Sequence, residues 1–407
     1  MKILFISSHA FLPSTRKTSV HFVSQALADR GHAVSTVSVG FSTLTYLKDR
    51  ALYRSLASAQ KNRFVEQSPG YRSACYMPLF HPFSTQNPTL NRATGWFFRL
   101  YGQVLPHFLK EELRSADAVF LEGGTSLCLF DAIRRCKPEI LLIYFRRDHL
   151  DSIGASSYLT EVEQRIAPLF DHVCVPSPCM ARHLPARSKV TYLPQGIEKR
   201  AFDLCRTSPY PRNSRNAVVV GNMLFDKDAV IAMAASAPDV CFHLFGSGIC
   251  GPFPGNVKVY GERPFGETVP FIKFADFGIA PYKMSKRERY LVQSSLKLIQ
   301  YSYCLLPIVA PDLLAGSRAN LIVYRQDGED DWASVIGRAL EAKRSTAWNK
   351  GILSWEDVAM RVEEQLTALR MPQACGDGFA ERLESPGLLA FAPAGLRDPL
   401  RISSTTT

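Results

Sequence analysis

Short apolar runs alternate with amphipathic stretches along the first half of the chain. The run KILFISS (2–8) is followed by SVHFVSQALADRG, which has helical spacing, and then by a second run, HAVSTVSVG. Further runs are DAVFLEG (117–123), EILLIYF (139–145), HVCVPSP (172–178) and KVTYLPQGI (189–197). Strands that are apolar along their whole length and separated by helices are typical of a parallel sheet covered on both faces. The pattern therefore predicts a doubly wound α/β domain.

The second half of the chain repeats this alternation after RTSPYPRNSRN (206–216). This segment is rich in Pro, Arg and Ser, which predicts a linker. Its apolar runs are AVVVGN, CFHLFG, VKVYGE, FGIAPY, LPIVAP and LIVYR. Two doubly wound, Rossmann-like α/β domains joined by a linker predict the GT-B architecture. Ligands of such sheets bind at the carboxyl ends of the strands, here in a central cleft. We expect an N-terminal domain at 1–205 and a C-terminal domain at 206–350.

A late amphipathic stretch, SWEDVAMRVEEQLTAL (354–369), predicts one further helix. Ser354 and Asp357 have the spacing of a capping box at its start. We expect the segment 351–371 to cross back to the N-terminal domain. The tail at 372–407 is rich in Pro, Gly, Ser and Thr, and we expect it to be mobile.

Composition narrows the class of protein. The 407 residues are 46% hydrophobic and 21% charged, as in soluble globular proteins. The ten cysteines form no C-x-x-C pair and no zinc-like cluster, so we expect reduced thiols and no metal site. MKILFISSHAF is too short in its apolar part for a signal peptide, and no run reaches the roughly 18–20 apolar residues of a membrane-spanning helix.

The net charge of +11 is concentrated near the N-terminus, where residues 1–100 hold 12 Lys and Arg against 3 Asp and Glu. Such a region attracts anionic lipid or nucleic acid, unless it is only a solvated face. The segments at 44–64 and 91–108 add Leu, Tyr, Trp and Phe among Arg and Lys. In the second segment one helical face would hold Trp96, Phe97, Leu100, Tyr101, Val104 and Leu105. Basic amphipathic segments suit a membrane interface, although helices that face the core are the alternative.

Three motifs resemble known sites but have simpler interpretations. GSGICG (246–251) matches a dinucleotide fingerprint, but PFPG follows it and cannot start the required helix. DKD (226–228) resembles a metal-binding motif, yet Asp226 is well placed to cap the next helix. Glu356 and Glu364 have the spacing of an acidic pair in retaining transferases, but they fall in the last helix and read as surface acids.

QSSLKLIQYSYCLLPIVAP (293–311) predicts a helix beginning near Ser294, after a strand that ends at Tyr282 and a loop from 283 to about 293. The first amides of a helix lack internal partners and, with the helix dipole, bind anions. Lys297 adds a positive charge, and Gln300 lies on the same face. The pattern indicates a site for the diphosphate of a nucleotide. The alternative is that Lys297 reaches solvent from an ordinary helix.

Four segments in this order resemble the GumK family, the inverting β-glucuronosyltransferases of xanthan-type exopolysaccharide assembly. They are VGNMLFD (220–226), VYGE (259–262), FGIAPY (277–282) and YLVQSSLKLIQY (290–301). The resemblance covers most of residues 140–370 and is looser before them. It is fairly specific, because GT-B proteins in general have acidic residues where this chain has SSLKLIQY.

The resemblance implies a UDP site. Met223, Glu262, Tyr282 and Leu291 would surround the uridine, and Lys297 and Gln300 would lie near the ribose and phosphates. Ser294, Ser295 and Leu296 complete the motif, with Leu296 where the family has Met. The loop KMSKRERY (283–290) is unusually basic, so either it binds the carboxylate of the donor or the transferred sugar differs from that of the family.

An inverting transfer needs a base for the acceptor hydroxyl. YFRRDHLDS (144–152) places Asp148 at the carboxyl end of a strand, where GumK-like sequences have their catalytic aspartate. His9, at the end of the first strand, is the alternative base. Arg146 and Arg147 could hold an acceptor phosphate or lower the pKa of Asp148.

The family further implies glucuronate transfer from UDP-glucuronate to a polyprenyl-diphosphate-linked oligosaccharide. The enzyme would be peripheral, on an anionic membrane surface at the cytoplasmic face of the inner membrane, and would need no cofactor or metal. Alternatives are a GT-B transferase for another nucleotide sugar, a nucleotide-sugar epimerase, or a basic nucleic-acid-binding protein. We expect no nucleic acid partner, since no known reader motif is present.

Overall fold

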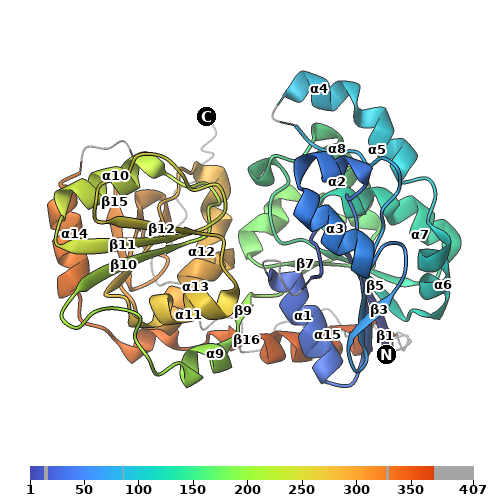
Figure 1. Ribbon diagram of the computed structural model, residues 1–407. Coiled ribbons are helices and arrows are strands. Elements are labelled where there is room, and N and C mark those ends of the chain that lie inside the picture. Colours follow the sequence, from blue (N-terminus) through green and yellow to red (C-terminus); the bar gives the residue numbers. More distant parts are fainter. Residues whose placement is uncertain (13–16, 86, 327–329, 371–407) are drawn as a thin grey trace, which may run out of the picture.

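Two α/β domains lie side by side in the computed structural model (Figure 1), which describes residues 1–12, 17–85, 87–326 and 330–370. The predicted mobile tail at 372–407 lies outside the described residues. Each domain has its own sheet, and both predicted sets of strands are present. The predicted two-domain architecture is therefore confirmed.

The N-terminal sheet has eight strands in the order β3-β4-β2-β1-β5-β6-β7-β8. They are β1 (Lys2–Ser7), β2 (Ala33–Ser38), β3 (Val65–Ser68), β4 (Tyr71–Cys75), β5 (Ala118–Glu122), β6 (Leu141–Phe145), β7 (His172–Val175) and β8 (Val190–Tyr192). The prediction of an all-parallel sheet is wrong at one edge, where β3 runs antiparallel to β4. Only two residues separate these strands, so they form a hairpin, whereas parallel neighbours need a longer crossover.

Helices cover both faces of this sheet, as the apolar strands predicted. One face packs against α1 (Ser19–Asp29) and the last helix, α15 (Trp355–Arg370). The other face packs against a larger group of helices. These are α5 (Gly95–Tyr101), α6 (His107–Ser115), α7 (Phe130–Cys136) and α8 (Ser157–Ile166). The short helices α2 (Thr43–Lys48), α3 (Arg50–Ala59) and α4 (Pro88–Ala93) complete the domain.

The C-terminal sheet has six strands, all parallel, in the order β12-β11-β10-β13-β14-β15. They are β10 (Arg215–Val220), β11 (Val240–Phe245), β12 (Val257–Gly261), β13 (Phe277–Ile279), β14 (Ile308–Pro311) and β15 (Leu321–Tyr324). The helices α10 (Lys227–Ser236) and α14 (Trp332–Glu341) cover one face. The other face is covered by α11 (Phe265–Phe274) and α13 (Leu296–Tyr303), which follows the short helix α12 (Leu291–Ser294).

The chain passes between the domains twice. Its first passage includes β9 (Gly196–Ile197) and α9 (Lys199–Leu204), and its second includes β16 (Leu353–Ser354), which pairs with β9. We expected the boundary at 205, but α9 already packs on α11, where the rings of Phe202 and Phe265 are 5.9 Å apart. The chain thus already contacts the C-terminal domain before residue 205.

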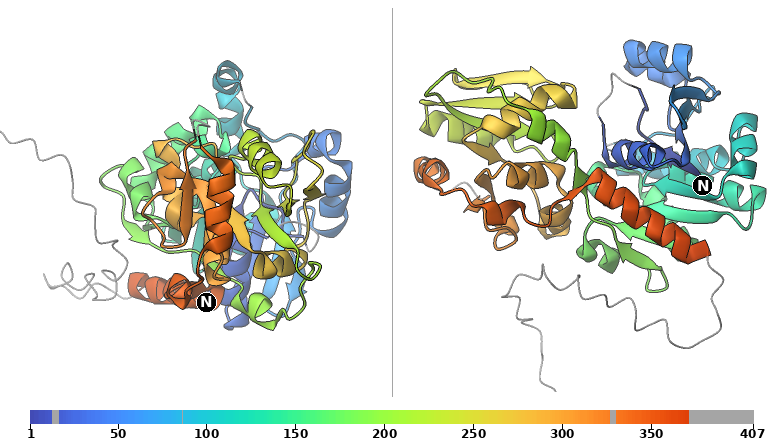
Figure 2. Two further views of the ribbon diagram at one scale, coloured as in Figure 1. Left: turned by 90° about the vertical axis from the view of Figure 1, so that its left-hand side faces the viewer. Right: turned by 90° about the horizontal axis from the view of Figure 1, so that it is seen from below.

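The last helix, α15, crosses back to the N-terminal domain as predicted, and Figure 2 shows it lying along that domain. The predicted capping box is also present. The Ser354 amide donates to Asp357 at 2.7 Å, and the Asp357 amide donates to the Ser354 hydroxyl at 3.1 Å.

Aromatic stacking and an ion pair fix α15 on α1. The ring of Trp355 lies parallel to that of Phe22, with centroids 5.2 Å apart. At the other end of the helix, Glu363 accepts from Arg30 at 2.6 Å and pairs with His32 at 2.8 Å. These contacts fix the last helix on the N-terminal domain.

The predicted helix at 91–108 is interrupted. α5 ends at Tyr101 and α6 begins at His107, so the six residues expected on one face separate into two groups. Tyr101 and Leu105 are buried in the core, while Trp96, Leu100 and Val104 are more than half exposed. The alternative of core-facing helices is thus correct for part of this segment and wrong for the rest.

Candidate active site

The carboxyl ends of the strands of the two sheets meet at the gap between the domains, and side chains bridge it. The Ser177 hydroxyl, after β7, donates to Gln293 of α12 at 2.6 Å. The Ser152 hydroxyl, which follows β6, donates to Glu288 at 3.1 Å. These contacts join the two domains across the predicted cleft.

Asp148 lies in this cleft, three residues after β6, where the sequence predicted it. Its side chain is half-buried. Tyr290, which belongs to the C-terminal domain and is buried, donates its hydroxyl to Asp148 Oδ1 at 3.5 Å. The candidate base of one domain therefore contacts a residue of the other.

His9, the alternative base, reaches the same edge of the N-terminal sheet. Its Nε2 lies 3.7 Å from Glu122, which ends β5 and also accepts from the hydroxyl of Ser7. The two candidate bases, His9 and Asp148, therefore lie at the same end of the cleft. Glu122 was not predicted, although it is the only charged residue in its strand, AVFLE.

The surroundings of Asp148 make it a better base than an exposed aspartate. Burial raises its pKa, and the charge of Glu122 raises it further. His9, Arg147 and the hydrogen bond from Tyr290 act in the opposite direction but do not cancel these effects. A carboxylate with a raised pKa takes a proton from a hydroxyl more readily.

This shift predicts the pH dependence of any reaction that uses Asp148 as a base. The base must be ionised, so kcat/KM should fall as the pH drops through a value above the ordinary range of aspartate. In Tyr290→Phe the hydrogen bond that lowers the pKa is lost, and the acidic limb should move to still higher pH. Tyr324→Phe is the control, because the buried hydroxyl of Tyr324 has no partner among the described residues. An unchanged acidic limb in Tyr290→Phe would contradict this assignment.

The two arginines before Asp148 turn to opposite faces of the sheet. Arg146 is 2% exposed and donates to Glu163 at 2.8 Å and to Met180 O at 2.9 Å, so it is a structural residue and the expected phosphate contact is wrong for it. Arg147 stacks on Phe145, 3.5 Å from the ring centroid. Its charge lowers the pKa of Asp148. This is the second of the two roles that the sequence suggested for Arg147, the first being contact with an acceptor phosphate.

On the other side of the cleft, α13 begins at Leu296 rather than near Ser294, which instead ends α12. Ser295 caps α13, and its hydroxyl accepts from the Leu298 amide at 3.5 Å. The Ser295 hydroxyl also lies 2.6 Å from the hydroxyl of Tyr282, which is buried after β13. The predicted loop before α13 is largely helical, since it contains a 3₁₀ helix at Lys286–Tyr290 as well as α12.

Lys297 is 9% exposed and points into the domain, so the alternative of a lysine that reaches solvent is wrong. Its Nζ donates to Gly221 O, just after β10, at 3.4 Å and lies 4.6 Å from the centroid of the Tyr282 ring. Gly221 adopts a positive φ of 77°, which suits glycine. The ammonium group is therefore held between the ends of β10 and β13.

The other predicted donor-site residues lie around these strand ends to different degrees. Leu291 is buried and Ser294 has a buried hydroxyl without a partner among the described residues. Met223 and Gln300 are half-buried, and Glu262 is exposed after β12. Leu296, by contrast, packs against the N-terminal core cluster that contains Leu193 and Trp355. It contributes to the contact between the domains.

The motifs with simpler interpretations behave as expected. The Asp226 side chain caps α10 by accepting from the Ala229 amide at 3.1 Å, and Glu356 and Glu364 are exposed on α15. No helix follows the glycines at 246–251 before β12. Within the described part of the chain, no group of three or more His, Cys, Asp and Glu residues could hold a metal ion.

Two comparisons by sequence agree with the predicted family. The family model for the N-terminal domain of the glucuronosyltransferase GumK matches residues 5–176. The resemblance therefore extends into the region before residue 140, where the motifs alone indicated less. The chain is also 32% identical, over 362 residues, to the UDP-glucuronate:glycolipid 2-beta-glucuronosyltransferase of Xanthomonas campestris pv. campestris. The match covers 88% of each protein.

Solved structures of low sequence identity support the fold. OtsA in its apo form matches with a TM-score of 0.61 and 11% identity, over 91% of this chain and 100% of that one. HepE of Anabaena, in complex with UDP and glucose, matches with a TM-score of 0.58 and 12% identity, over 90% of this chain and 100% of that one. These similarities show the GT-B fold of glycosyltransferases.

Proposed function

Because the chain belongs to the GumK family of GT-B glucuronosyltransferases, we propose that it transfers glucuronate from UDP-glucuronate to a glycolipid, with Asp148 as the catalytic base. The acceptor would be a polyprenyl-diphosphate-linked oligosaccharide of exopolysaccharide synthesis. The observation that carries the proposal is the position of Asp148, which lies across the cleft from the helix bearing Lys297 and contacts Tyr290 of the same domain as that helix.

The transfer is a single displacement with inversion. Asp148 takes the proton of the acceptor hydroxyl while the oxygen bonds to the anomeric carbon of the sugar. The bond from that carbon to the diphosphate breaks at the same time, and UDP leaves with its electron pair. One carboxylate is protonated and one glycosidic bond replaces another, so atoms and charges balance. A water molecule can later remove the proton from Asp148, whose side chain is only half-buried.

The charge that develops on UDP would be met by the ammonium group of Lys297 and by the positive end of the α13 dipole. An oriented cation and a helix dipole stabilise a leaving diphosphate most strongly in the transition state, when its charge is greatest. We assign Met223, Glu262, Tyr282 and Leu291 to the uridine end of the site and Gln300 to the ribose and phosphates. Ser294 and Ser295 lie at the helix start beside them. In this arrangement Lys297 takes the place that a divalent cation has in other transferases.

Initial rates with a panel of UDP-glucuronate, UDP-glucose and GDP-mannose test the proposed donor, with and without EDTA. We expect turnover with UDP-glucuronate, weak or no turnover with the other two, and no effect of EDTA. Stronger turnover of another donor would show a transferase of different specificity. Conversion of the donor in the absence of acceptor, to a second nucleotide sugar, would instead show an epimerase.

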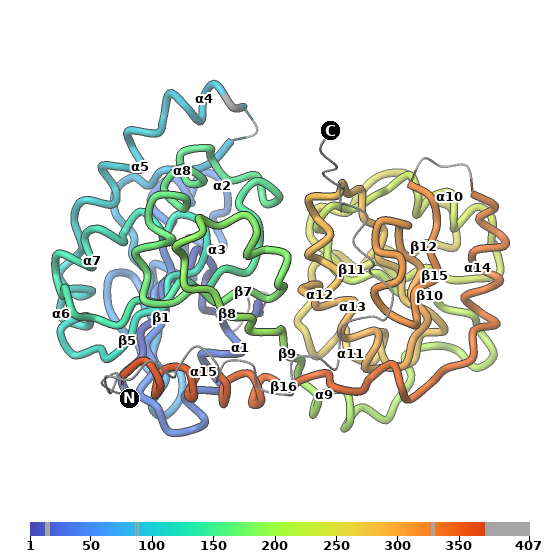
Figure 3. Tube along the Cα trace, turned by 180° about the vertical axis from the view of Figure 1, so that it is seen from behind, coloured from blue at the N-terminus to red at the C-terminus, as the bar shows by residue number. Residues whose placement is uncertain are grey.

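An exposed apolar and basic surface on the N-terminal domain would bring the enzyme to its lipid-linked acceptor. Leu90, Trp96 and Leu100 are 47, 66 and 55% exposed, on α4 and α5, and Leu47 of α2 is 78% exposed. Figures 1 and 3 both place α2, α4 and α5 at the same end of the domain. Exposed Arg and Lys residues of these helices are Lys48, Arg92 and Arg99.

No helix among the described residues is long and apolar enough to span a bilayer. We propose peripheral binding to anionic lipid on the cytoplasmic face of the inner membrane.

Flotation with vesicles tests this surface. We expect the protein to float with vesicles that contain anionic lipid, and to float less as the salt concentration rises. The double variant Trp96→Ser/Leu100→Ser should float several-fold less, because both side chains leave water when the helix enters the interface. Leu204→Ser, at an equally exposed leucine of the C-terminal domain, is the control. Equal flotation of the double variant and the control would contradict the proposed surface.

A further inference from the structure

Two adjoining cavities form a polar groove on the N-terminal domain beside the catalytic cleft. The first has a volume of about 210 Å³ and lies between α8 and the turn that follows Asp148. The second, of about 430 Å³, is more open and shares Asp151, Thr160 and Gln164 with the first. It continues along α8 to Ser157 and Glu161. The groove is therefore longer than a single small-molecule pocket.

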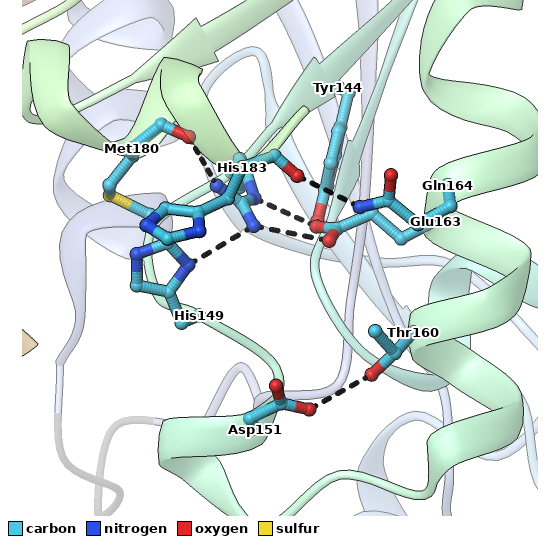
Figure 4. A network of polar contacts seen from close by, with 9 residues as sticks. Tyr144, His149, Asp151, Thr160, Glu163, Gln164, Met180 and His183 are labelled. Atoms are coloured by element: carbon cyan, nitrogen blue, oxygen red, sulfur yellow. Dashed lines mark hydrogen bonds and ion pairs between the residues drawn. The ribbon is translucent and has the colours of Figure 1, made fainter. Parts of the chain in front are cut away.

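The wall of the first cavity is held rigidly by a buried network (Figure 4). Glu163 accepts from the Tyr144 hydroxyl at 2.5 Å and from Arg146 Nε at 2.8 Å. Arg146 Nη2 lies 3.2 Å from His149 Nδ1. In Figure 4, His149 is on one side of the opening, and Asp151 and Thr160 are on the other, joined by a hydrogen bond of 3.2 Å. A site built in this way needs little rearrangement to bind a ligand.

The groove has no excess of positive charge, since its two arginines are matched by Asp151, Glu163 and Glu161, and this argues against an anionic ligand. Arg146 is paired with Glu163, and Arg287, which reaches across from the C-terminal domain, is 3.5 Å from Asp151. Burial, with the nearby charge of Arg146, lowers the pKa of His149 to about 3, so this imidazole is neutral. A diphosphate would need cations that are not already paired. A neutral ligand rich in hydroxyl groups suits the groove better.

The remaining polar groups are those that bind hydroxyls. The Thr160 hydroxyl and the Gln164 amide can each donate and accept, and the Asp151 carboxylate accepts. Gln164 is oriented by a bond of 2.9 Å from its Nε2 to His183 O. Leu150 closes the wall of the first cavity but is buried, so polar groups dominate the accessible surface. A few directed polar groups fix the orientation of a ligand in a small-molecule site.

The groove begins next to the candidate base. The ring of Tyr290 lies 4.6 Å from that of His149, between centroids, while its hydroxyl contacts Asp148. One side chain thus separates the groove from the point where the acceptor hydroxyl must lie. A chain of sugars that presents one hydroxyl to Asp148 can continue into the groove.

We propose that this groove binds the neutral sugars of the acceptor that follow the sugar being glucuronylated, with Thr160 and Gln164 as specificity-determining residues. The inference rests on the proposed function, because it needs an oligosaccharide acceptor at Asp148. In this proposal, α8 of the N-terminal domain recognises the length and composition of the acceptor. The donor is bound by α13 of the other domain.

Glycolipids that carry one, two or three neutral hexoses on the same lipid diphosphate test this groove. With the unaltered enzyme, kcat/KM should rise as the acceptor lengthens. In Thr160→Ala/Gln164→Met this gain should fall roughly 10-fold, since each lost neutral hydrogen bond accounts for roughly a 2- to 13-fold change. Transfer to the one-hexose glycolipid and the KM for the donor should be unchanged. Gln67→Met, an exposed glutamine on β3, is the control.

Two measurements separate the groove from the proposed function. Transfer to the one-hexose glycolipid tests the function alone, and the gain between one and three hexoses tests the groove. A double variant that loses the same factor on all three acceptors, or that keeps the full gain, overturns the groove while the function stands. Absence of transfer with all three acceptors overturns both proposals. Thermal melting of the variants should match that of the control, which shows that the fold is intact.

Discussion

Asp148→Asn should reduce glucuronate transfer by about 10²–10⁴-fold, the usual contribution of a general base, and leave the affinity for UDP unchanged. The amide has the shape of the carboxylate but cannot take a proton. Its oxygen can still accept from the Tyr290 hydroxyl, so the contact across the cleft is kept. Rates of transfer and calorimetric titration with UDP measure the two quantities separately.

The control for this variant is Asp239→Asn, an exposed aspartate at the start of β11 that pairs with Arg215. It should have ordinary activity.

His9→Gln tests the alternative base. We expect a smaller loss of transfer than in Asp148→Asn, because the His9 side chain is about half exposed and its nearest charged partner is Glu122. Activity of Asp148→Asn within about tenfold of the unaltered enzyme would exclude Asp148 as the base.

Most strands could be located along the chain because central strands such as β1, β5 and β10 are buried and apolar along most of their length. Such runs stand out from the helices between them. The hairpin of β3 and β4 was missed for the opposite reason. β3 (VEQS) is half exposed or exposed throughout, and β4 (YRSAC) contains an exposed arginine, so neither stands out as an apolar run.

The positions of Asp148 and Lys297 could be predicted because each depends on one local feature, the end of a parallel strand or the start of a helix. The partners that bridge the cleft could not. Tyr290 and Gln293 reach the N-terminal domain only through the relative position of the two domains. That position depends on contacts between distant parts of the chain, such as the packing of Leu296 against the cluster that contains Leu193 and Trp355.

The helix at 91–108 shows a further limit of periodicity. A helical repeat places Trp96, Leu100 and Tyr101 close together on one face, but it does not say which part of that face meets the core. Tyr101 contacts the ring of Tyr76 in the core, at 5.5 Å between centroids, while Trp96 and Leu100 remain exposed. The break after Tyr101 also turns Leu105 back into the core. The exposed residues are those that now support the proposed membrane surface.

The contacts across the cleft link the two substrate sites. Tyr290 and Gln293 precede α13 by a few residues, and both contact the N-terminal domain. A nucleotide bound at the start of α13 therefore lies next to the segment that contacts Asp148. Binding of the donor and orientation of the base should consequently depend on each other, and the variants at Asp148 and Lys297 test the two sides of this arrangement.

Lys297→Met should weaken UDP binding by roughly 10- to 150-fold, which corresponds to the loss of about 1.5–3 kcal/mol from one hydrogen bond to a charged group. Transfer should fall further, by about 10²–10³-fold in kcat, because the charge on UDP is larger in the transition state than in the bound donor. Methionine keeps the length of the side chain against Tyr282, so the variant should fold. Lys343→Met removes the same charge from an exposed position of the same domain and should bind UDP normally. If Lys297→Met bound UDP as tightly as this control, the diphosphate would have to lie elsewhere, and the start of α13 could not be the donor site.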